Sequence, residues 1–232
     1  MRPRSSVCLS KAQSIAPHVT KNLGFNPSKD FTPITNVLIT EGAIVANAAT
    51  PFSSVKEFVA YAKANPGKVS YASVGNGSIP HLTAEMFAQR AGVSLLHVPY
   101  KGSSPATADL ISGQTTLMFD AIPSATPNIK ANRLRALAIT SKTRNGSAPE
   151  VPTLDEAGVK GYEVMAWVGL VAPAGTPQAI VDKLYKAIAD VLASKEVQEK
   201  LLSLGADAAP QTPTEFAAYM KDEVKRWQKV IT

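Results

Sequence analysis

Cysteine is nearly absent from this chain of 232 residues, in which Cys8 is the one residue of its kind. A single cysteine excludes an intramolecular disulfide bond and a zinc site built from thiolates. The three histidines, His18, His81 and His97, lack the spacing of a metal-binding motif such as His-Glu-x-x-His. We therefore expect no metal site. No Walker A motif is present either, so we expect no nucleotide and no other cofactor.

Long apolar runs are missing as well. No stretch approaches the ~20 apolar residues that a membrane-spanning helix needs. The charged start at residues 1–4 is followed by an apolar run of only Val7, Cys8 and Leu9, whereas a secretory leader needs about 7–15 apolar residues. We expect no signal peptide in the sequence as it stands. The net charge is +6, but the basic residues are scattered without interleaved aromatic residues, so we expect no nucleic-acid partner.

Periodic apolar residues predict a regular alternation of strands and helices. The predicted helices begin near Ser53 or Ser54, Ser78, Ser104, Thr176 and Thr212, with a short one over 197–204. The predicted strands are short apolar runs at 37–39, 69–72, 95–98, 117–119, 134–139 and 164–171. This alternation is typical of an α/β fold with mostly parallel sheets.

Three strand-to-helix turns share an unusual composition. Their sequences are SVGNGS (73–78), PYKGSS (99–104) and DAIPS (120–124). Ligands of open α/β sheets sit at the carboxyl ends of the strands, and glycine and serine at helix starts leave N–H groups free for an anion. A Gly-Ser pair before a helix is usually only a cap, but three such turns together favour a site for a small carboxylate.

Individual side chains in these turns allow two interpretations each. Lys101 supplies positive charge to a ligand or is an exposed loop lysine. Asp120 accepts a hydrogen bond from a ligand or caps the next helix. Tyr100 and Trp167 pack on a ligand or belong to the core. His97 lies in an apolar strand and is expected to be a core residue.

A hydrolase is the alternative from another functional class. Ser78, His81 and Asp120 contain the residue types of a catalytic triad, and a small α/β serine hydrolase would use them. The nucleophile motif Gly-x-Ser-x-Gly is absent, however, and we expect no enzyme activity.

The order and spacing of several segments resembles a known family. These segments are VSYASVGNGS (69–78) with His81-Leu82 and Glu85-Met86-Phe87, HVPYKG (97–102), DLISGQ (109–114), LRALAIT (134–140), VPTLDEAG (151–158), WVG (167–169) and APAGTP (172–177). Together they resemble the Bug (TctC-like) family, the solute receptors of tripartite tricarboxylate transporters. The resemblance covers the chain from about Ser14 to Thr232.

The resemblance implies a two-lobed periplasmic-binding-protein architecture of the type II, flytrap kind. In it, residues 1–47 are a remnant of the first lobe, 48–163 form the second, ligand-binding lobe, and 164–232 return to the first lobe. The implied function is binding of a dicarboxylate, amino acid or aromatic acid in an interlobe cleft. The implied protein is a periplasmic monomer that works with membrane permease subunits. The ligand-binding residues that it implies are Ser73, Gly75, Asn76, Gly77, Ser78, His81, Tyr100, Lys101, Gly102, Ser103, Ser104 and Asp120.

The N-terminal segment departs from the family. Family members have a leader and then a strand that ends in a Pro/Gly-Gly loop, and neither is found at the start of this sequence. We interpret the chain as an N-terminally shortened receptor with an incomplete first lobe. On this interpretation its first-lobe helices expose apolar faces and its affinity for ligand is reduced. A degenerate receptor lobe that serves as an interaction module is the remaining alternative.

Overall fold

The computed structural model describes residues 6–20, 22–146 and 148–231. The charged start at residues 1–4 lies outside the described residues. The chain forms two compact units, of which unit 2 is the continuous stretch Glu41–Met165, and unit 1 contains the residues up to Thr40 and from Ala166 onwards. The family resemblance implied boundaries at 47/48 and 163/164, whereas the two units change at 40/41 and 165/166.

The first boundary differs because strand β2 (Phe31–Asn47) runs unbroken through it. Only its residues 37–39 were predicted, since Thr35, Asn36 and Glu41 interrupt the apolar run with buried polar side chains. Two of these side chains have hydrogen-bond partners far away in the sequence. The Thr35 hydroxyl donates to Gln211 O at 2.8 Å, and the Glu41 carboxylate accepts from the Ser141 hydroxyl. Strand β2 therefore contributes its first part to unit 1 and its second part to unit 2.

The sheet of unit 2 has the strand order β4-β3-β5-β2-β6. Strands β4 (Leu96–Pro99), β3 (Ser70–Ser73) and β5 (Leu117–Ala121) are parallel, as the sequence predicts. Strand β2 is antiparallel to both of its neighbours, β5 and β6 (Leu134–Ile139). The carboxyl ends of β3, β4, β5 and β6 consequently meet at one edge of this sheet.

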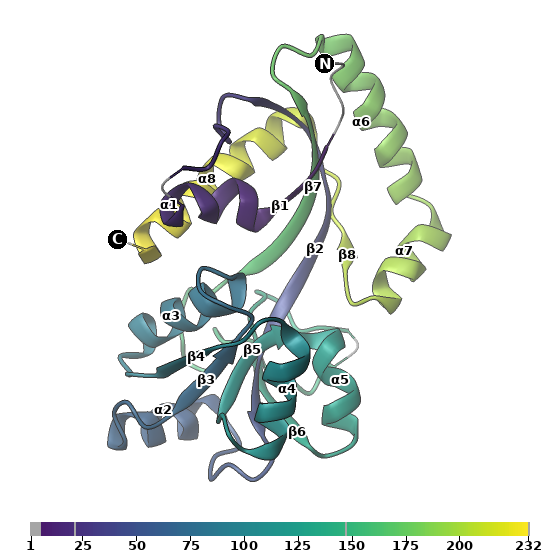
Figure 1. Cartoon of the computed structure of the whole chain (residues 1–232). Coiled ribbons are helices and arrows are strands. Elements are labelled where there is room, and N and C mark those ends of the chain that lie inside the picture. Colours follow the sequence, from purple (N-terminus) through teal and green to yellow (C-terminus); the bar gives the residue numbers. More distant parts are fainter. Residues whose placement is uncertain (1–5, 21, 147, 232) are drawn as a thin grey trace. The chain divides into compact units, whose positions relative to one another are not determined.

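Helices cover both faces of this sheet (Figure 1). On one face α4 (Ser103–Ser112) and α5 (Ile122–Lys130) pack on Ala72 and Met118. On the other face α2 (Val55–Ala64) and α3 (Ile79–Ala91) bury an aromatic cluster, in which the rings of Phe58 and Phe87 stack at 5.4 Å and Phe87 contacts Phe119. Each such phenyl ring contributes about 1.5–3 kcal/mol of burial free energy. Alternate residues of each strand therefore serve opposite layers.

Unit 1 combines short strands with helices at both ends of the chain. Strand β1 (Ser6–Leu9) pairs antiparallel with β7 (Met165–Pro173), and β8 (Asp207–Ala208) pairs with β2. A π-helix, η1 (Lys11–Ile15), continues into α1 (Ala16–Val19), which contacts α8 (Pro213–Ile231). Helices α6 (Gln178–Leu192) and α7 (Lys195–Ser203) complete the unit. Of these elements the sequence analysis lacked β1, η1, α1 and β8.

The core of unit 1 forms around Trp167. Its ring meets Phe216 edge-on at 5.4 Å, and both residues are fully buried. Gly169 lies beneath Phe216, where an added Cβ atom would stand 2.2 Å from the Phe216 Cζ atom. Cys8 packs in the same cluster, and burial raises the pKa of its thiol to about 11. Trp167 is therefore a core residue.

Exposed apolar side chains gather in unit 1. Val7 on β1 is 67% exposed, and Leu204 after α7 is 60% exposed. On the helices, Ile180 is 50% exposed, and Val191 and Leu202 are each 57% exposed. Exposed apolar faces were expected on the first-lobe helices. In the part of the chain that the structure describes, no helix is long and apolar enough to cross a membrane.

Candidate functional site

Three helix N-termini meet at the edge of the unit 2 sheet where its parallel strands end. Strand β3 leads into α3, β4 into α4 and β5 into α5, each within a few residues. Because these strands are neighbours and parallel, the turns between 73 and 124 that the sequence analysis singled out lie along one edge. Backbone contacts join them directly: Tyr100 N donates to Ser73 O at 2.9 Å, and a Cβ atom on Gly75 would stand 3.5 Å from Tyr100 O.

The turn between β3 and α3 bends on two glycines in the left-handed region. Gly75 has φ 119° and Gly77 has φ 65°, conformations that other residues rarely adopt. Ser78 is the buried N-cap of α3, and its hydroxyl accepts a hydrogen bond from His81 N at 3.3 Å. Asn76, between the glycines, is exposed. This turn therefore presents one exposed amide side chain.

Two histidines stack beneath this turn. The imidazoles of His81 and His97 are 4.1 Å apart between centroids, and the Tyr71 ring stacks on His97 at 4.9 Å. His81 Nδ1 accepts a hydrogen bond from Gly77 N at 3.2 Å. Burial lowers the pKa of both histidines, and for His97 the neighbouring His81 lowers the pKa further. Both shifts favour the neutral form of the two imidazoles.

Ser73 is hydrogen-bonded to this stack. Its hydroxyl lies 2.6 Å from His97 Nε2, and the same oxygen accepts from Gly75 N at 3.2 Å. Ser73 is fully buried, so its side chain supports the turn from below. His97 was expected to be a satisfied core residue. In the structure it is half-buried and links β4 to the end of β3.

The turn between β4 and α4 carries the cationic side chain of the site. Gly102 is the N-cap residue of α4 with φ 118° and has no side chain to satisfy the N–H groups of the first turn. Lys101, Ser103 and Ser104 are exposed. The Tyr100 hydroxyl donates to Asp109 Oδ2 at 2.7 Å, and burial together with this carboxylate raises the pKa of Tyr100 to about 12. The tyrosine therefore braces the turn against α4.

Asp120 at the end of β5 is engaged by its own neighbours. One carboxylate oxygen accepts from Ala121 N at 2.9 Å, and the other accepts from the Ser124 hydroxyl at 2.5 Å. Burial raises the pKa of Asp120, and these hydrogen bonds counteract part of that rise. Both carboxylate oxygens are thus engaged beside the start of α5, whose N-cap residue is Ala121 and not Asp120.

A cluster on β2 and after β6 was not predicted as part of the site. Glu41 is buried, and its carboxylate accepts hydrogen bonds from the Ser141 hydroxyl at 2.5 Å and from Asn145. Thr140 lies beside it, with its hydroxyl accepting from Gly42 N at 2.8 Å and donating to Val164 O at 2.6 Å. Register pairs Gly42 with Ala121, so the cluster adjoins Asp120 at the same edge. A lone acid inside the apolar run of β2 was the only available signal.

The hydrolase triad is not formed. Ser78 uses its hydroxyl to cap α3, His81 turns its Nδ1 atom to Gly77 N, and Asp120 is bonded to Ala121 and Ser124. The Ser–His pair that does exist is Ser73 with His97, of which Ser73 is fully buried under the turn and His97 is half-buried. Among the described residues, no group of three or more His, Cys, Asp and Glu side chains could hold a metal ion.

Sequence comparison relates nearly the whole chain to one family. The family described as "Tripartite tricarboxylate transporter family receptor" matches residues 6–232. A UPF0065 protein from the tcbD-tcbE intergenic region of Pseudomonas sp. strain P51 is 41% identical over 89% of this chain and 62% of its own length. Protein BugT of Bordetella pertussis is 33% identical over 98% of this chain and 68% of its own length. The chain thus spans somewhat less than two thirds of the first of these relatives.

Solved structures agree with the sequence comparison. R. palustris Rpa4515 with adipate has a TM-score of 0.86 and 32% identity, covering 97% of this chain and 75% of that one. The periplasmic binding protein BugD has a TM-score of 0.82 and 36% identity, covering 97% and 76%. MatC from Rhodopseudomonas palustris with bound malate has a TM-score of 0.82 and 31% identity, covering 98% and 79%. The fold is that of the periplasmic binding proteins, and the chain belongs to the family of receptors of tripartite tricarboxylate transporters, which are solute-binding proteins and not enzymes.

Proposed function

We propose that this chain binds a small carboxylate solute at the turns where β3, β4 and β5 end. The observation that carries this proposal is the meeting of the N-termini of α3, α4 and α5 at one sheet edge. The N-terminus of a helix carries the positive end of the helix dipole and N–H groups without intrahelical partners, and both stabilise an anion.

The turns differ in what they offer to a carboxylate. The start of α4 supports direct binding most strongly, because Gly102 leaves its N–H groups uncapped and Lys101, Ser103 and Ser104 are exposed around it. The turn before α3 adds the exposed Asn76 amide, while the N–H groups of Gly75 and Gly77 are engaged by Ser73 and His81. A buried carboxylate needs several such hydrogen bonds to offset its lost hydration.

The remaining residues act as supports in this proposal. Ser73, Ser78, His81 and Tyr100 use their polar atoms within the protein, so they hold the turns in a binding conformation. Asp120 lies at the third turn, where its carboxylate favours a hydroxyl or ammonium group of the solute as a hydrogen-bond donor. The solved relatives with adipate and malate support a dicarboxylate as the solute class.

The wider role follows from the family. We propose that the chain is the extracytoplasmic receptor of a tripartite tricarboxylate-type transporter, acts in the periplasm and hands its solute to membrane permease subunits. The family description and the periplasmic relative BugD support this role.

Calorimetric titration of the full chain with adipate and with malate tests the proposal. We expect at least one dicarboxylate to bind, whereas hexanediol, which has the carbon chain of adipate without its charge, does not bind. Replacement of Lys101 by glutamine should weaken binding by ~2- to 5-fold, the range of an exposed ion pair. The matched control is Lys68→Gln, an exposed lysine before β3 at the other end of that strand. Equal effects of the two substitutions, or binding of hexanediol as tight as that of adipate, would contradict the proposal.

A further inference from the structure

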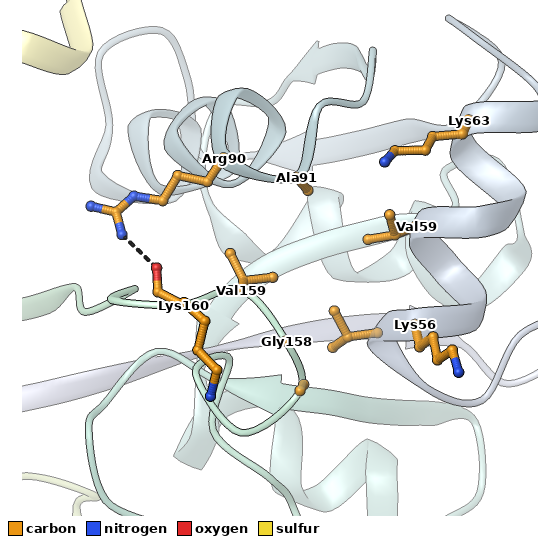
Figure 2. A pocket seen from close by; sticks show the side chains of 10 residues that line it. Lys56, Val59, Lys63, Arg90, Ala91, Gly158, Val159 and Lys160 are labelled. Carbon is orange, nitrogen blue, oxygen red and sulfur yellow. Dashed lines mark hydrogen bonds between the residues drawn. The ribbon is translucent and has the colours of Figure 1, made fainter.

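Unit 2 contains a pocket at the opposite end of α3 from the turns of the solute site. This pocket has a volume of about 650 Å³ and is formed by α2, the end of α3 and the loop at 157–160 (Figure 2). We call it the basic pocket, after its four cationic residues Lys56, Lys63, Arg90 and Lys160. Its volume falls within the range of about 300–1,000 Å³ that is typical of small-molecule sites.

The basic pocket is separate from the turns of the proposed solute site. Helix α3 begins after Ser78 at the sheet edge and reaches the basic pocket with Arg90 and Ala91. At 1.5 Å per residue, Ser78 and Arg90 are roughly 18 Å apart along the helix. A ligand in the basic pocket therefore does not touch the turns of the solute site.

Cationic groups surround an apolar floor. Val55 and Val159 are buried, and Figure 2 shows Val59 on α2 and Val159 on the loop pointing toward one another. Lys56 and Lys63 lie on either side of Val59 on the same helix. They are seven positions apart, which corresponds to ~10 Å along the helix axis. Lys63 extends from α2 toward Ala91 (Figure 2).

Arg90 is already held in place on the opposite wall. Its guanidinium donates to Lys160 O at 3.1 Å and lies 5.8 Å from the centroid of the Tyr162 ring. Both contacts restrict the side chain without neutralising its charge, because neither partner is anionic. A positioned cation loses less conformational freedom when it binds an anion.

The nearby acidic residues are engaged and leave most of this charge uncompensated. Asp155 forms an ion pair with Lys160 at 3.3 Å. The Glu57 carboxylate accepts hydrogen bonds from the backbone N–H of Ser53 at 2.7 Å and from the Ser53 hydroxyl at 2.9 Å. Within the described part of the chain, no carboxylate pairs with Lys56 or Lys63. The basic pocket thus carries excess positive charge over an apolar surface.

We propose that the basic pocket binds a small organic polyanion, in which two or more acid groups are attached to an apolar body. The floor of valine and alanine side chains buries the body, and the lysines and Arg90 pair with acid groups around it. An inorganic anion would leave the floor in contact with water, and a neutral apolar molecule would leave the cations unpaired. The chemistry of the site therefore requires both features in one ligand.

Pyranine, a fluorescent pyrene that carries three sulfonate groups, is a suitable probe. The fluorescence anisotropy of pyranine, titrated with the full chain, measures binding. Titrations at ionic strengths of about 0.05 and 0.15 M show how far salt screens the attraction between the charges. We expect pyranine to bind more tightly than tripolyphosphate, which has comparable charge but no apolar body. The double substitution Lys56→Gln/Lys63→Gln should weaken pyranine binding about tenfold, whereas Ser78→Ala should leave it unchanged.

The matched control removes the same charge elsewhere. Lys183→Gln/Lys186→Gln alters two exposed lysines on α6, in unit 1, and should leave pyranine affinity unchanged. Val59→Ser tests the floor and should weaken pyranine but not tripolyphosphate, with circular dichroism as the check that the chain is folded. The proposal is overturned if both lysine pairs have the same effect, which indicates attraction by net charge, or if tripolyphosphate binds as tightly as pyranine.

Discussion

The Ser73 hydroxyl and His97 Nε2 lie 2.6 Å apart and join the ends of two neighbouring parallel strands. The same serine oxygen accepts a hydrogen bond from Gly75 N. Through Ser73, His97 on β4 therefore supports the turn that follows β3. Because His81 stacks on His97 and accepts from Gly77 N, two imidazoles hold one glycine-rich turn. The hydrogen bond from Gly77 N therefore depends on an unprotonated Nδ1 atom of His81.

Stability should fall as the pH is lowered through the range where histidine titrates. Burial lowers the pKa of His81 and His97 in the folded state from the ordinary value of 6.5, although the carboxylate of Glu85 opposes this. Below about pH 6.5 the unfolded chain takes up protons that the folded chain does not, so the free energy of unfolding decreases. Urea unfolding at pH 7.5, 6.5 and 5.5 measures this slope.

The double variant His81→Gln/His97→Gln isolates the contribution of the two rings. We expect a shallower decrease between pH 7.5 and 5.5 than in the parent chain, and an unchanged slope would show that other groups are responsible. Asp120 acts in the opposite direction, because burial raises its pKa and the folded state keeps a proton that the unfolded state loses above about pH 3.8. Since Asp120 is present in both proteins, its effect cancels in the comparison.

Two serine caps of matched geometry separate folding from binding. Ser54 accepts from Glu57 N on α2 and Ser78 accepts from His81 N on α3, each at 3.3 Å. Replacement of either serine by alanine should cost about 1 kcal/mol of stability, the usual contribution of an N-cap. Only Ser78→Ala should also weaken dicarboxylate binding in calorimetry, because it loosens the start of α3. Unchanged affinity in both variants would remove Ser78 from the proposed site.

Gly169 should tolerate no side chain. An added Cβ atom would stand 2.2 Å from Phe216 Cζ and 3.1 Å from Thr35 O, so both ring and backbone would have to shift. We expect Gly169→Ala to destabilise the chain by about 1–3 kcal/mol, the cost of overpacking a core. Thermal unfolding measures the loss. Gly146→Ala is the control, since open space surrounds that position, and a similar loss in both variants would contradict the steric explanation.

Glu41 should matter for stability more than an exposed glutamate. Its buried carboxylate accepts from the Ser141 hydroxyl and the Asn145 amide, and hydrogen bonds to a charged group contribute about 1.5–3 kcal/mol. Glu41→Gln keeps the shape of the side chain but places an NH₂ group where a carboxylate oxygen accepted a hydrogen bond from Ser141 or Asn145. We therefore expect the free energy of unfolding, measured with urea, to fall by about 1.5–3 kcal/mol. Glu199→Gln, which removes an exposed pair with Lys195 at 3.7 Å, should change little. Equal effects would contradict the importance of burial.

The elements of unit 2 follow from local sequence signals. The strand predicted at 134–139 has the bounds of β6, and the turns at 73–78, 99–104 and 120–124 lie where parallel strands end. A helix was expected to follow the turn at 120–124, but its extent was not predicted because Pro127 interrupts its periodic pattern. The helix is supported by packing of Ile122 and Ala125 on the sheet, which single-sequence periodicity does not register.

The polar connections of the candidate site could not be predicted. Glu41 and Ser141 are 100 positions apart, and Ser73 and His97 are brought together by the register of β3 on β4. Such contacts depend on strand order, which the alternation of elements leaves undetermined. For the same reason, only residues 37–39 of β2 were predicted as a strand. Its polar residues indicate strand ends unless their hydrogen-bond partners elsewhere in the sequence are known.

The division of the chain into units has a consequence for its synthesis. Glu41–Met165 is continuous, whereas unit 1 needs residues from both sides of it. As the polypeptide leaves the ribosome, every strand of the central module is available before α6 has been translated, so this module can acquire its tertiary structure early. The edge strand β1 can pair only after β7, more than 150 positions later in the sequence, has been synthesised. Pairing of β1 with β7 closes a longer loop than the pairings within unit 2 and therefore costs more conformational entropy.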